Sequence, residues 1–219
     1  LGVSMDRHCR GVLRLFLDSD VAPGTDDSYI GGAEYLSRRD VDDLVANLGP
    51  LVQGAVFTPR DEYVDPATLM EGLSDRCRAL GVRIHEGRSL RRAIEARDSV
   101  TMMTDDGSIT ASHVVLAAGV GSRRIAQTLG VSLPVFAGKG YGFDYGPELS
   151  SRGPALYLTE AKVAVTPLRR GLRLSGTMEF GSEGMRAEGR RPAGIHEAAA
   201  KYFAQWPSRP PAAWAGLRP

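Results

Sequence analysis

The second half of the chain holds four strand-like stretches with no helix between them, and this feature limits the fold more than any other. The stretches lie at 134–145, 155–160, 162–167 and 172–180, and turn residues separate them. Parallel strands need a long crossover connection, whereas antiparallel strands can be joined by a short turn. This half of the chain therefore predicts an antiparallel sheet.

The middle of the chain has a different pattern, in which helices and strands alternate. Asp65 is a natural N-cap, Pro66 suits the first helical position, and Gly81 ends the helix. A strand at 82–87 is expected to follow at once, and a helix that enters a strand through one glycine is typical of α/β construction. The apolar residues expected on one face of this helix are Leu69, Met70, Leu73, Cys77 and Leu80.

A second α/β feature lies just downstream. The run HVVLAAG at 113–119 is almost continuously apolar, short and bounded by polar residues and glycine, which predicts a buried parallel strand. A helix from Ser122 to Gly130 follows it. Upstream, an Asp-Asp-Gly-Ser turn at 105–108 between two strand-like stretches predicts a hairpin.

The remaining segments complete a mixed fold. We expect a strand at 11–17, a loop at 21–28, a short helix at 40–48 behind an Asp40 cap, and a strand at 55–59. The predicted class is α+β mixed with α/β, with an antiparallel portion interleaved around a smaller α/β portion. A helix at 194–206 ends the pattern, and its inward residues are expected to be Ile195, Ala198, Ala199, Tyr202 and Phe203.

Composition narrows the class of protein. A net charge of +1 gives no reason to expect nucleic acid as a partner, and no apolar run approaches the length of a membrane span. Cys9 and Cys77 are far apart in the sequence; two reduced thiols are favoured, and a single disulfide stays open. The arginine doublets are interpreted as solvated faces: Arg38-Arg39, Arg91-Arg92, Arg123-Arg124 and Arg190-Arg191.

Familiar catalytic and metal-binding motifs do not occur. No histidine is spaced with Cys, Asp or Glu as in a metal site, and His85 and His113 are interpreted as structural histidines in strands. The sequence has no G-x-S-x-G and no P-loop. The stretch at 138–143, GKGYGF, lacks the third glycine of G-x-G-x-x-G and continues as a strand. Lys139 within it is expected to be solvated.

Three stretches in order carry a family resemblance. These are FTPRDEYVDPATLMEGLSDRCRALGVRIHEG at 57–87, HVVLAAGVGSRRIAQTLG at 113–130, and KVAVTPLRRGLRLSGTMEF at 162–180 followed by WAGLRP at 214–219. Together they resemble the D-amino-acid dehydrogenase and glycine oxidase group, the DAO family of FAD-dependent amine oxidoreductases, from Gly11 to Pro219.

The resemblance implies an interleaved domain order. Residues 1–60 and 131–213 would form the two parts of a substrate domain, and residues 61–130 part of a Rossmann-like FAD-binding domain. Residues 214–219 would begin the return to that domain. The family's pyrophosphate-binding G-x-G-x-x-G helix and its last flavin-binding segment have no counterpart here, so the chain is interpreted as a central fragment.

The resemblance also implies roles for single residues. Arg218 of the GLRP stretch would bind the substrate carboxylate, and Tyr141 would line the substrate pocket, although a core position fits Tyr141 equally well. The glycine oxidase branch has a tyrosine where this chain has Ala164, which favours the dehydrogenase branch. No catalytic side chain or metal ligand is implied. The cofactor-side residues would be Leu90, Ala117, Ala118, Gly119, Val120 and Ser122.

The implied activity is oxidative deamination of a D-amino acid or similar small amine, with hydride transfer to FAD. As a fragment, the chain is expected to bind FAD weakly and to be inactive alone. Two alternatives stay open: a non-catalytic module with the fold of the substrate domain, and one part of a two-chain flavoenzyme completed by a complementary chain or segment. The expected location is cytoplasmic, with attachment to the inner-membrane surface left open.

Overall fold

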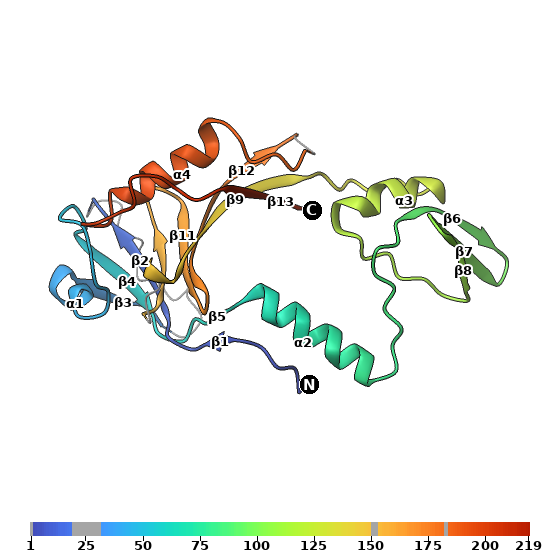
Figure 1. The fold of residues 1–219 in the computed structure, drawn as a ribbon, viewed down its shortest axis with the longest axis horizontal. Coiled ribbons are helices and arrows are strands. Elements are labelled where there is room, and N and C mark those ends of the chain that lie inside the picture. Colours follow the sequence, from blue (N-terminus) through green and yellow to red (C-terminus); the bar gives the residue numbers. More distant parts are fainter. Residues whose placement is uncertain (1, 19–31, 150–152, 182–183) are drawn as a thin grey trace. The chain divides into compact units, whose positions relative to one another are not determined.

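The computed structural model describes residues 2–18, 32–149, 153–181 and 184–219, and the chain divides into two compact units (Figure 1). The first unit contains residues 1–76, 140–178 and 185–216, and the second contains residues 77–139, 179–184 and 217–219. The loop expected at 21–28 lies outside the described residues. Each unit has its own sheet, so each is described by itself.

An eight-stranded sheet is the main feature of the first unit, in the order β13-β9-β12-β11-β10-β2-β4-β3. The pairs β10–β11, β11–β12, β2–β4 and β3–β4 are antiparallel, whereas β10 and β2 are parallel. The antiparallel arrangement predicted from residues 155–180 is therefore confirmed, and the N-terminal strands extend the same sheet. The strands are β2 (Val12–Phe16), β3 (Glu34–Ser37), β4 (Gly54–Thr58), β9 (Gly138–Tyr145), β10 (Ala155–Leu158), β11 (Val163–Leu168), β12 (Gly171–Phe180) and β13 (Ala213–Arg218).

One face of this sheet forms the hydrophobic core. Along β11, Val163 and Val165 are buried while Ala164 between them is half-buried, because successive side chains of a strand point to opposite faces. Helix α4 (Arg190–Ala200) lies along the sheet and contributes Ile195 and Ala199 to the core (Figure 1). The amphipathic helix predicted at 194–206 is thus present, although it ends at Ala200. The core also includes Leu13, Leu15, Leu158, Leu174 and Tyr202.

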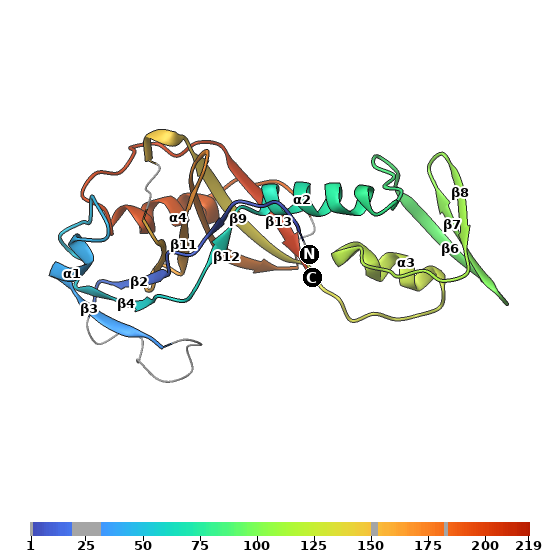
Figure 2. The same ribbon diagram turned by 90° about the horizontal axis from the view of Figure 1, so that it is seen from below.

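Helix α1 (Arg38–Asp42) is shorter than predicted and starts earlier, at the edge of the sheet beside β3 and β4 (Figure 2). Its N-cap is Ser37, not Asp40: the Ser37 hydroxyl accepts from the Asp40 N–H, and the Asp40 carboxylate accepts from the Ser37 N–H at 3.0 Å. Arg38 donates to the carbonyl oxygens of Gly49 (2.7 Å) and Val52 (3.1 Å). The interpretation of Arg38 as solvated was therefore wrong, since its guanidinium group satisfies carbonyl oxygens of the loop between α1 and β4.

Helix α2 (Pro66–Ala79) has the predicted start but not the predicted buried face. Asp65 caps it, since its Oδ1 accepts from the Ala67 N–H at 2.9 Å, and Gly81 beyond its end has φ +82°. No described residue of the helix is buried. Met70 on the helix is 61% exposed, and Leu80, the residue after it, is 65% exposed. A short two-stranded sheet of β1 (Arg7–His8) and β5 (Tyr63–Val64) precedes the helix.

The second unit contains a three-stranded antiparallel sheet, β6 (Leu90–Ala96), β7 (Ser99–Thr104) and β8 (Gly107–Ala111). The hairpin predicted around 105–108 is the β7–β8 pair. Helix α3 (Ser122–Thr128) packs against β6, and its Ile125 and Ala126 are buried. Two short 3-10 turns, η2 (Gly119–Gly121) and η3 (Pro147–Leu149), complete the described elements.

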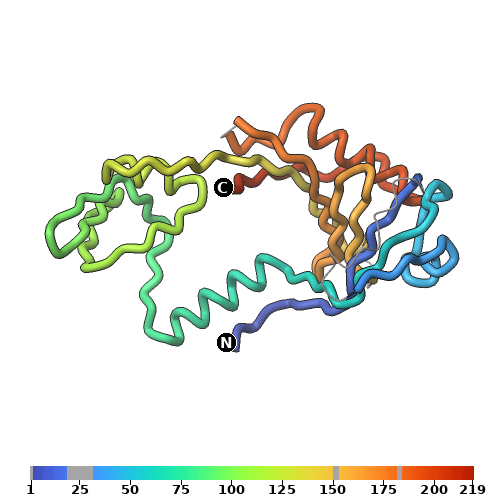
Figure 3. Tube along the Cα trace, turned by 180° about the vertical axis from the view of Figure 1, so that it is seen from behind, coloured from blue at the N-terminus to red at the C-terminus, as the bar shows by residue number. Residues whose placement is uncertain are grey.

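Two predicted strands did not form. Residues 82–87 run as a single extended trace (Figure 3), and residues 113–118 also lie outside any strand. Val115, expected in a buried strand, is 90% exposed. A strand exists only with a hydrogen-bonded neighbour, and no described strand pairs with either segment. His85 and His113 are consequently exposed and are not structural histidines in strands.

The environment of Lys139 also differs from the prediction. The residue was expected to be solvated, but it lies on β9, which has neighbours on both sides in the sheet, and only 5% of it is exposed. Its aliphatic stem allows a lysine to be covered in this way. Within the described part of the chain, no helix is both long and apolar enough to cross a membrane.

Candidate functional site

The small-residue turn before α3 is an open backbone surface. Ala118 and Gly119 are exposed, and Gly119 has φ +54°, a conformation that glycine adopts without strain. A Cβ added to Gly119 would meet nothing within 4 Å. The backbone here is therefore accessible to a ligand on its outer side. Ala117, also proposed for the cofactor side, is exposed beside it.

Ser122 holds this turn in place. Its side chain is buried, and its Oγ accepts from the Ala118 N–H at 3.0 Å. The Gly121 N–H donates to the Ala118 carbonyl oxygen at 3.0 Å and closes the turn. Ser122 thus supports the turn from within, while the residues before it face outward.

Leu90 is connected to the same region through an arginine. It is the first residue of β6, and its carbonyl oxygen accepts from Arg124 Nη2 at 3.3 Å. Arg124 belongs to α3, so one guanidinium group joins the start of β6 to the helix that follows the turn. Leu90 itself lines a separate, mainly apolar pocket of about 180 Å³ between the sheet and α3.

A cavity of about 460 Å³ lies beside the turn, entirely within the second unit. Val120, Gly121, Arg123 and Arg124 line it from one side. Leu217, the residue before Arg218, lines it as well. Arg218 is the exposed last residue of β13. The cavity therefore brings the neighbour of the predicted substrate arginine next to one of the predicted cofactor-side positions, Val120.

Tyr141 lies elsewhere, in the first unit. It is on β9, is 4% exposed, and belongs to the hydrophobic core together with Phe143 and Tyr145. Leu90, Val120 and Ser122 belong to the second unit. Its contact with a substrate stays a prediction.

Sequence reasoning passed over Arg123 and Arg124 as a solvated doublet. Both line the cavity, and the Arg123 guanidinium carbon lies 5.3 Å from the centre of the Phe136 ring. The signal that could have found them is their place, directly after a Gly-Val-Gly-Ser turn at the start of a helix. Two guanidinium groups beside an accessible backbone suit a phosphate-bearing ligand.

The residues present therefore fit part of a dinucleotide such as FAD. The open turn allows close approach of a ligand, and the exposed guanidinium groups of Arg123 and Arg124 have the charge and geometry to pair with phosphate oxygens. Within the described ranges, no group of three or more His, Cys, Asp or Glu side chains could hold a metal ion.

The fold is that of a flavin-dependent oxidase. A crystal structure of glycine oxidase from Geobacillus kaustophilus superimposes with a TM-score of 0.81 at 19% identity, over 99% of this chain and 60% of that one. This likeness shows the fold: a mixed α+β architecture in which an antiparallel sheet is interleaved with part of a Rossmann-like domain.

Sequence comparison identifies the family. The model of the DAO family, "FAD dependent oxidoreductase", matches residues 1–219, so the chain belongs to this family, whose cofactor is FAD. D-amino acid dehydrogenase of Bradyrhizobium diazoefficiens is 28% identical over 232 residues, covering 100% of this chain and 55% of the relative. That of Dechloromonas aromatica is 27% identical over 237 residues, covering 100% and 57%. The chain spans a little over half the length of these curated relatives.

Proposed function

We propose that the protein takes part in the oxidative deamination of a D-amino acid or a similar small amine. The observation that carries the proposal is the cavity beside the 118–122 turn, where Leu217 brings the GLRP strand end next to Val120 and Gly121. The family match over the whole chain and the D-amino acid dehydrogenases among its relatives support the same reaction.

In this proposal Arg218 binds the substrate carboxylate. A guanidinium group pairs with a carboxylate through two parallel, charge-assisted hydrogen bonds, which fix both position and orientation. The neutral amine loses a hydride from its α-carbon and becomes an iminium ion, which water hydrolyses to a keto acid and ammonium. FAD, when bound, supplies the hydride acceptor. The protein's contribution is orientation and charge, so no acid–base side chain is required.

Ala164 supports the dehydrogenase branch of the family. It lies on β11, half-buried, on the opposite face from the core residues Val163 and Val165. The tyrosine of the glycine oxidase branch would add a hydroxyl there, and alanine cannot. The curated relatives named D-amino acid dehydrogenase agree with this choice.

The domain assignment belongs to the same proposal. We assign substrate binding to the sheet formed by parts of 1–60 and 131–213, and FAD binding to 61–130 with the return at 214–219. Residues 66–76 of α2 cluster with the first unit and residues 77–139 with the second. A cytoplasmic location, with attachment to the inner-membrane surface as an alternative, rests on the family resemblance alone.

Arg218 provides the test of this function. In the FAD-loaded protein encoded by the natural gene, Arg218→Ala should lower kcat/KM for a D-amino acid by about 100-fold, and Arg218→Lys should lower it less. The matched control is Arg209→Ala, an exposed arginine outside the cavity. An amine that lacks the carboxylate should lose nothing in the Arg218 variants. An equal loss with both substrates would contradict the assigned role.

We further propose that the 219-residue chain by itself binds FAD weakly and does not turn over substrate. Its sequence has no G-x-G-x-x-G, the motif that places a pyrophosphate at a helix start. The absorption spectrum from 300 to 550 nm, recorded after FAD titration and gel filtration, tests this directly. A colourless protein is expected. Flavin bands that persist would show that the chain builds a cofactor site without that motif.

A second candidate is a part of a flavoenzyme completed by a complementary chain or segment. The second unit exposes large apolar residues, with Val115 at 90% and Phe136 at 67%. Exposed apolar patches commonly mark an interface. A non-catalytic module would instead leave these residues exposed. Hydrogen exchange of the 113–118 amides in the natural protein therefore separates the two candidates: protection favours the completed flavoenzyme, and fast exchange favours the non-catalytic module.

A further inference from the structure

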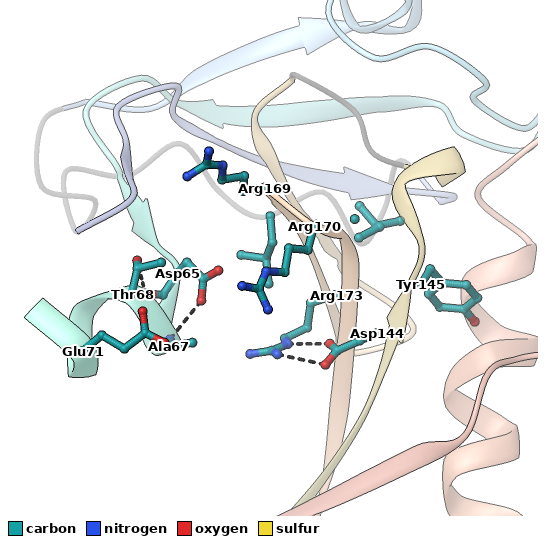
Figure 4. Close-up of a pocket in the computed structure, with 12 residues that line it drawn as sticks. Asp65, Ala67, Thr68, Glu71, Asp144, Tyr145, Arg169, Arg170 and Arg173 are labelled. Atoms are coloured by element: carbon teal, nitrogen blue, oxygen red, sulfur yellow. Dashed lines mark hydrogen bonds and ion pairs between the residues drawn. The ribbon is translucent and has the colours of Figure 1, made fainter. Parts of the chain in front are cut away.

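The first unit contains a cavity of about 720 Å³ that the proposed function does not use. It lies between the start of α2 and the β11–β12 hairpin, and it does not include Arg218 (Figure 4). Its size is within the range of pockets that bind small molecules. Six charged residues line it in equal numbers of each sign: Asp65, Glu71, Asp144, Arg169, Arg170 and Arg173.

The hairpin turn presents two of the arginines. Leu168 pairs with Gly171 across the turn, which leaves Arg169 and Arg170 as the two loop residues. Gly171 has φ +146°, and a Cβ there would lie 1.9 Å from the Tyr145 carbonyl oxygen, so only glycine allows this close approach. Both arginines are exposed and have no hydrogen bond or ion pair within the described residues.

Arg173 is held in a fixed position deeper in the cavity. Its Nε and Nη2 donate to the two carboxylate oxygens of Asp144 at 2.7 and 2.9 Å, and its guanidinium carbon lies 5.3 Å from the Trp214 ring centre. The hydrogen bond to Asp144 and the negative charges of Asp144 and Asp65 raise the pKa of Arg173 against the effect of burial. Nη1 remains able to donate to a ligand.

Acidic groups face these arginines from the start of α2. Asp65 is 8% exposed, and one of its oxygens accepts from the Ala67 N–H. Its other oxygen is directed into the cavity, toward Arg170 and Arg173 (Figure 4). Glu71 lies six residues further along, on α2, and is exposed. The cavity thus has a positive wall and a negative wall.

We propose that this cavity binds a small zwitterion, an amino acid or short peptide, with its carboxylate on Arg170 and Arg173 and its ammonium group on Asp65 and Glu71. A plain anion such as phosphate is disfavoured because three carboxylates share the lining. The volume leaves room for more than one residue, so a dipeptide fills it better than glycine. The site goes beyond the proposed oxidation and does not depend on it.

Ligand-observed NMR titration of the 219-residue chain with unmodified Ala-Ala tests the proposal. Two analogues remove one charge each: N-acetyl-Ala-Ala has only the carboxylate, and Ala-Ala amide has only the ammonium group. Each should bind at least about tenfold more weakly than Ala-Ala, because one ion pair is lost. Raising the salt concentration should weaken Ala-Ala binding, since the contacts are partly exposed.

Variants locate the site. Arg170→Ala and Glu71→Gln, both at exposed positions, should weaken Ala-Ala binding about tenfold without a change in the thermal unfolding midpoint. Arg209→Ala, an exposed arginine elsewhere, should bind as the unchanged chain does. Three results would overturn the proposal: no saturable binding of Ala-Ala, equal binding of the N-acetyl analogue, or unchanged binding in Arg170→Ala. The last result would mean that the dipeptide binds at another place.

Discussion

The two units of this protein differ in whether an apolar stretch of sequence is buried in a sheet. In the sheet of the first unit, Leu13 and Leu15 on β2 are fully buried between neighbouring strands. In the second unit, the equally apolar run at 113–118 has no strand beside it among the described residues, and Val115 is 90% exposed. The difference teaches that an apolar run becomes a strand only when another segment supplies its hydrogen bonds.

The largest expected difference between the units concerns two leucines. Leu174→Ala empties a fully buried core position on β12 and should lower the free energy of unfolding by about 2–5 kcal/mol. Leu80→Ala, at a residue 65% exposed, should change it by less than about 0.5 kcal/mol. Urea unfolding followed by circular dichroism measures both. Similar losses would mean that Leu80 is covered in solution.

Replacing a glycine with positive φ in each unit should also destabilise the two units to different extents. Gly171→Ala meets the Tyr145 carbonyl oxygen and should destabilise the first unit by about 2 kcal/mol or more. Gly119→Ala, in open space, carries only the backbone strain of about 1 kcal/mol. Urea midpoints would show both changes. A larger cost at Gly119 would indicate that another group lies against this turn.

Two serines at helix starts are expected to differ less in their contribution to stability. Ser37 caps α1 through a reciprocal pair of hydrogen bonds with Asp40, and Ser37→Ala should cost about 1 kcal/mol. Ser122 accepts from the Ala118 N–H, and Ser122→Ala should release the turn with a similar cost. Amide hydrogen exchange separates them, because only the second variant should raise exchange at Ala118. Unchanged exchange there would show that the turn is held by other contacts.

The free energy of unfolding should also depend on pH through one buried histidine of the first unit. His196 is 8% exposed, and its Nδ1 accepts from Trp206 Nε1 at 3.1 Å, so this nitrogen carries no proton. It also lies 2.6 Å from the Tyr145 hydroxyl. Burial lowers the pKa of His196 below its ordinary 6.5 and raises the pKa of Tyr145 to about 12.

The sign of the effect follows from linkage. The unfolded chain binds a proton at His196 before the folded chain does, so stability is constant above pH 6.5 and falls as the pH drops toward the lowered pKa. The slope for this one group cannot exceed about 1.4 kcal/mol per pH unit. Urea midpoints from pH 8 to 5 measure it, with His196→Gln as the variant that should lose this contribution. Exposed His85→Gln, in the second unit, should keep it.

Sequence reasoning found much of the first unit and the family, but only part of the site. The turns and alternation between 155 and 180 predicted the antiparallel strands, and the Asp65-Pro66 start predicted α2. The positions on the 118–122 turn came from the family resemblance, and their cofactor contacts stay predictions. Arg123, Arg124 and the cavity formed by Arg169, Arg170 and Arg173 were not foreseen, because a doublet of arginines has the same local pattern on a solvated face and on a cavity wall.

The sequence by itself determined the local features: where strands turn, where α2 and α3 begin, which face of α4 is apolar, and the order of motifs that marks the family. These follow from backbone and side-chain preferences within a few residues. Only the tertiary structure decided that 82–87 and 113–118 remain outside a sheet, that Lys139 is covered, and that Asp65 faces Arg173. Each of these depends on segments distant in the chain, which supply the hydrogen bonds, cover or charge that a local pattern cannot specify.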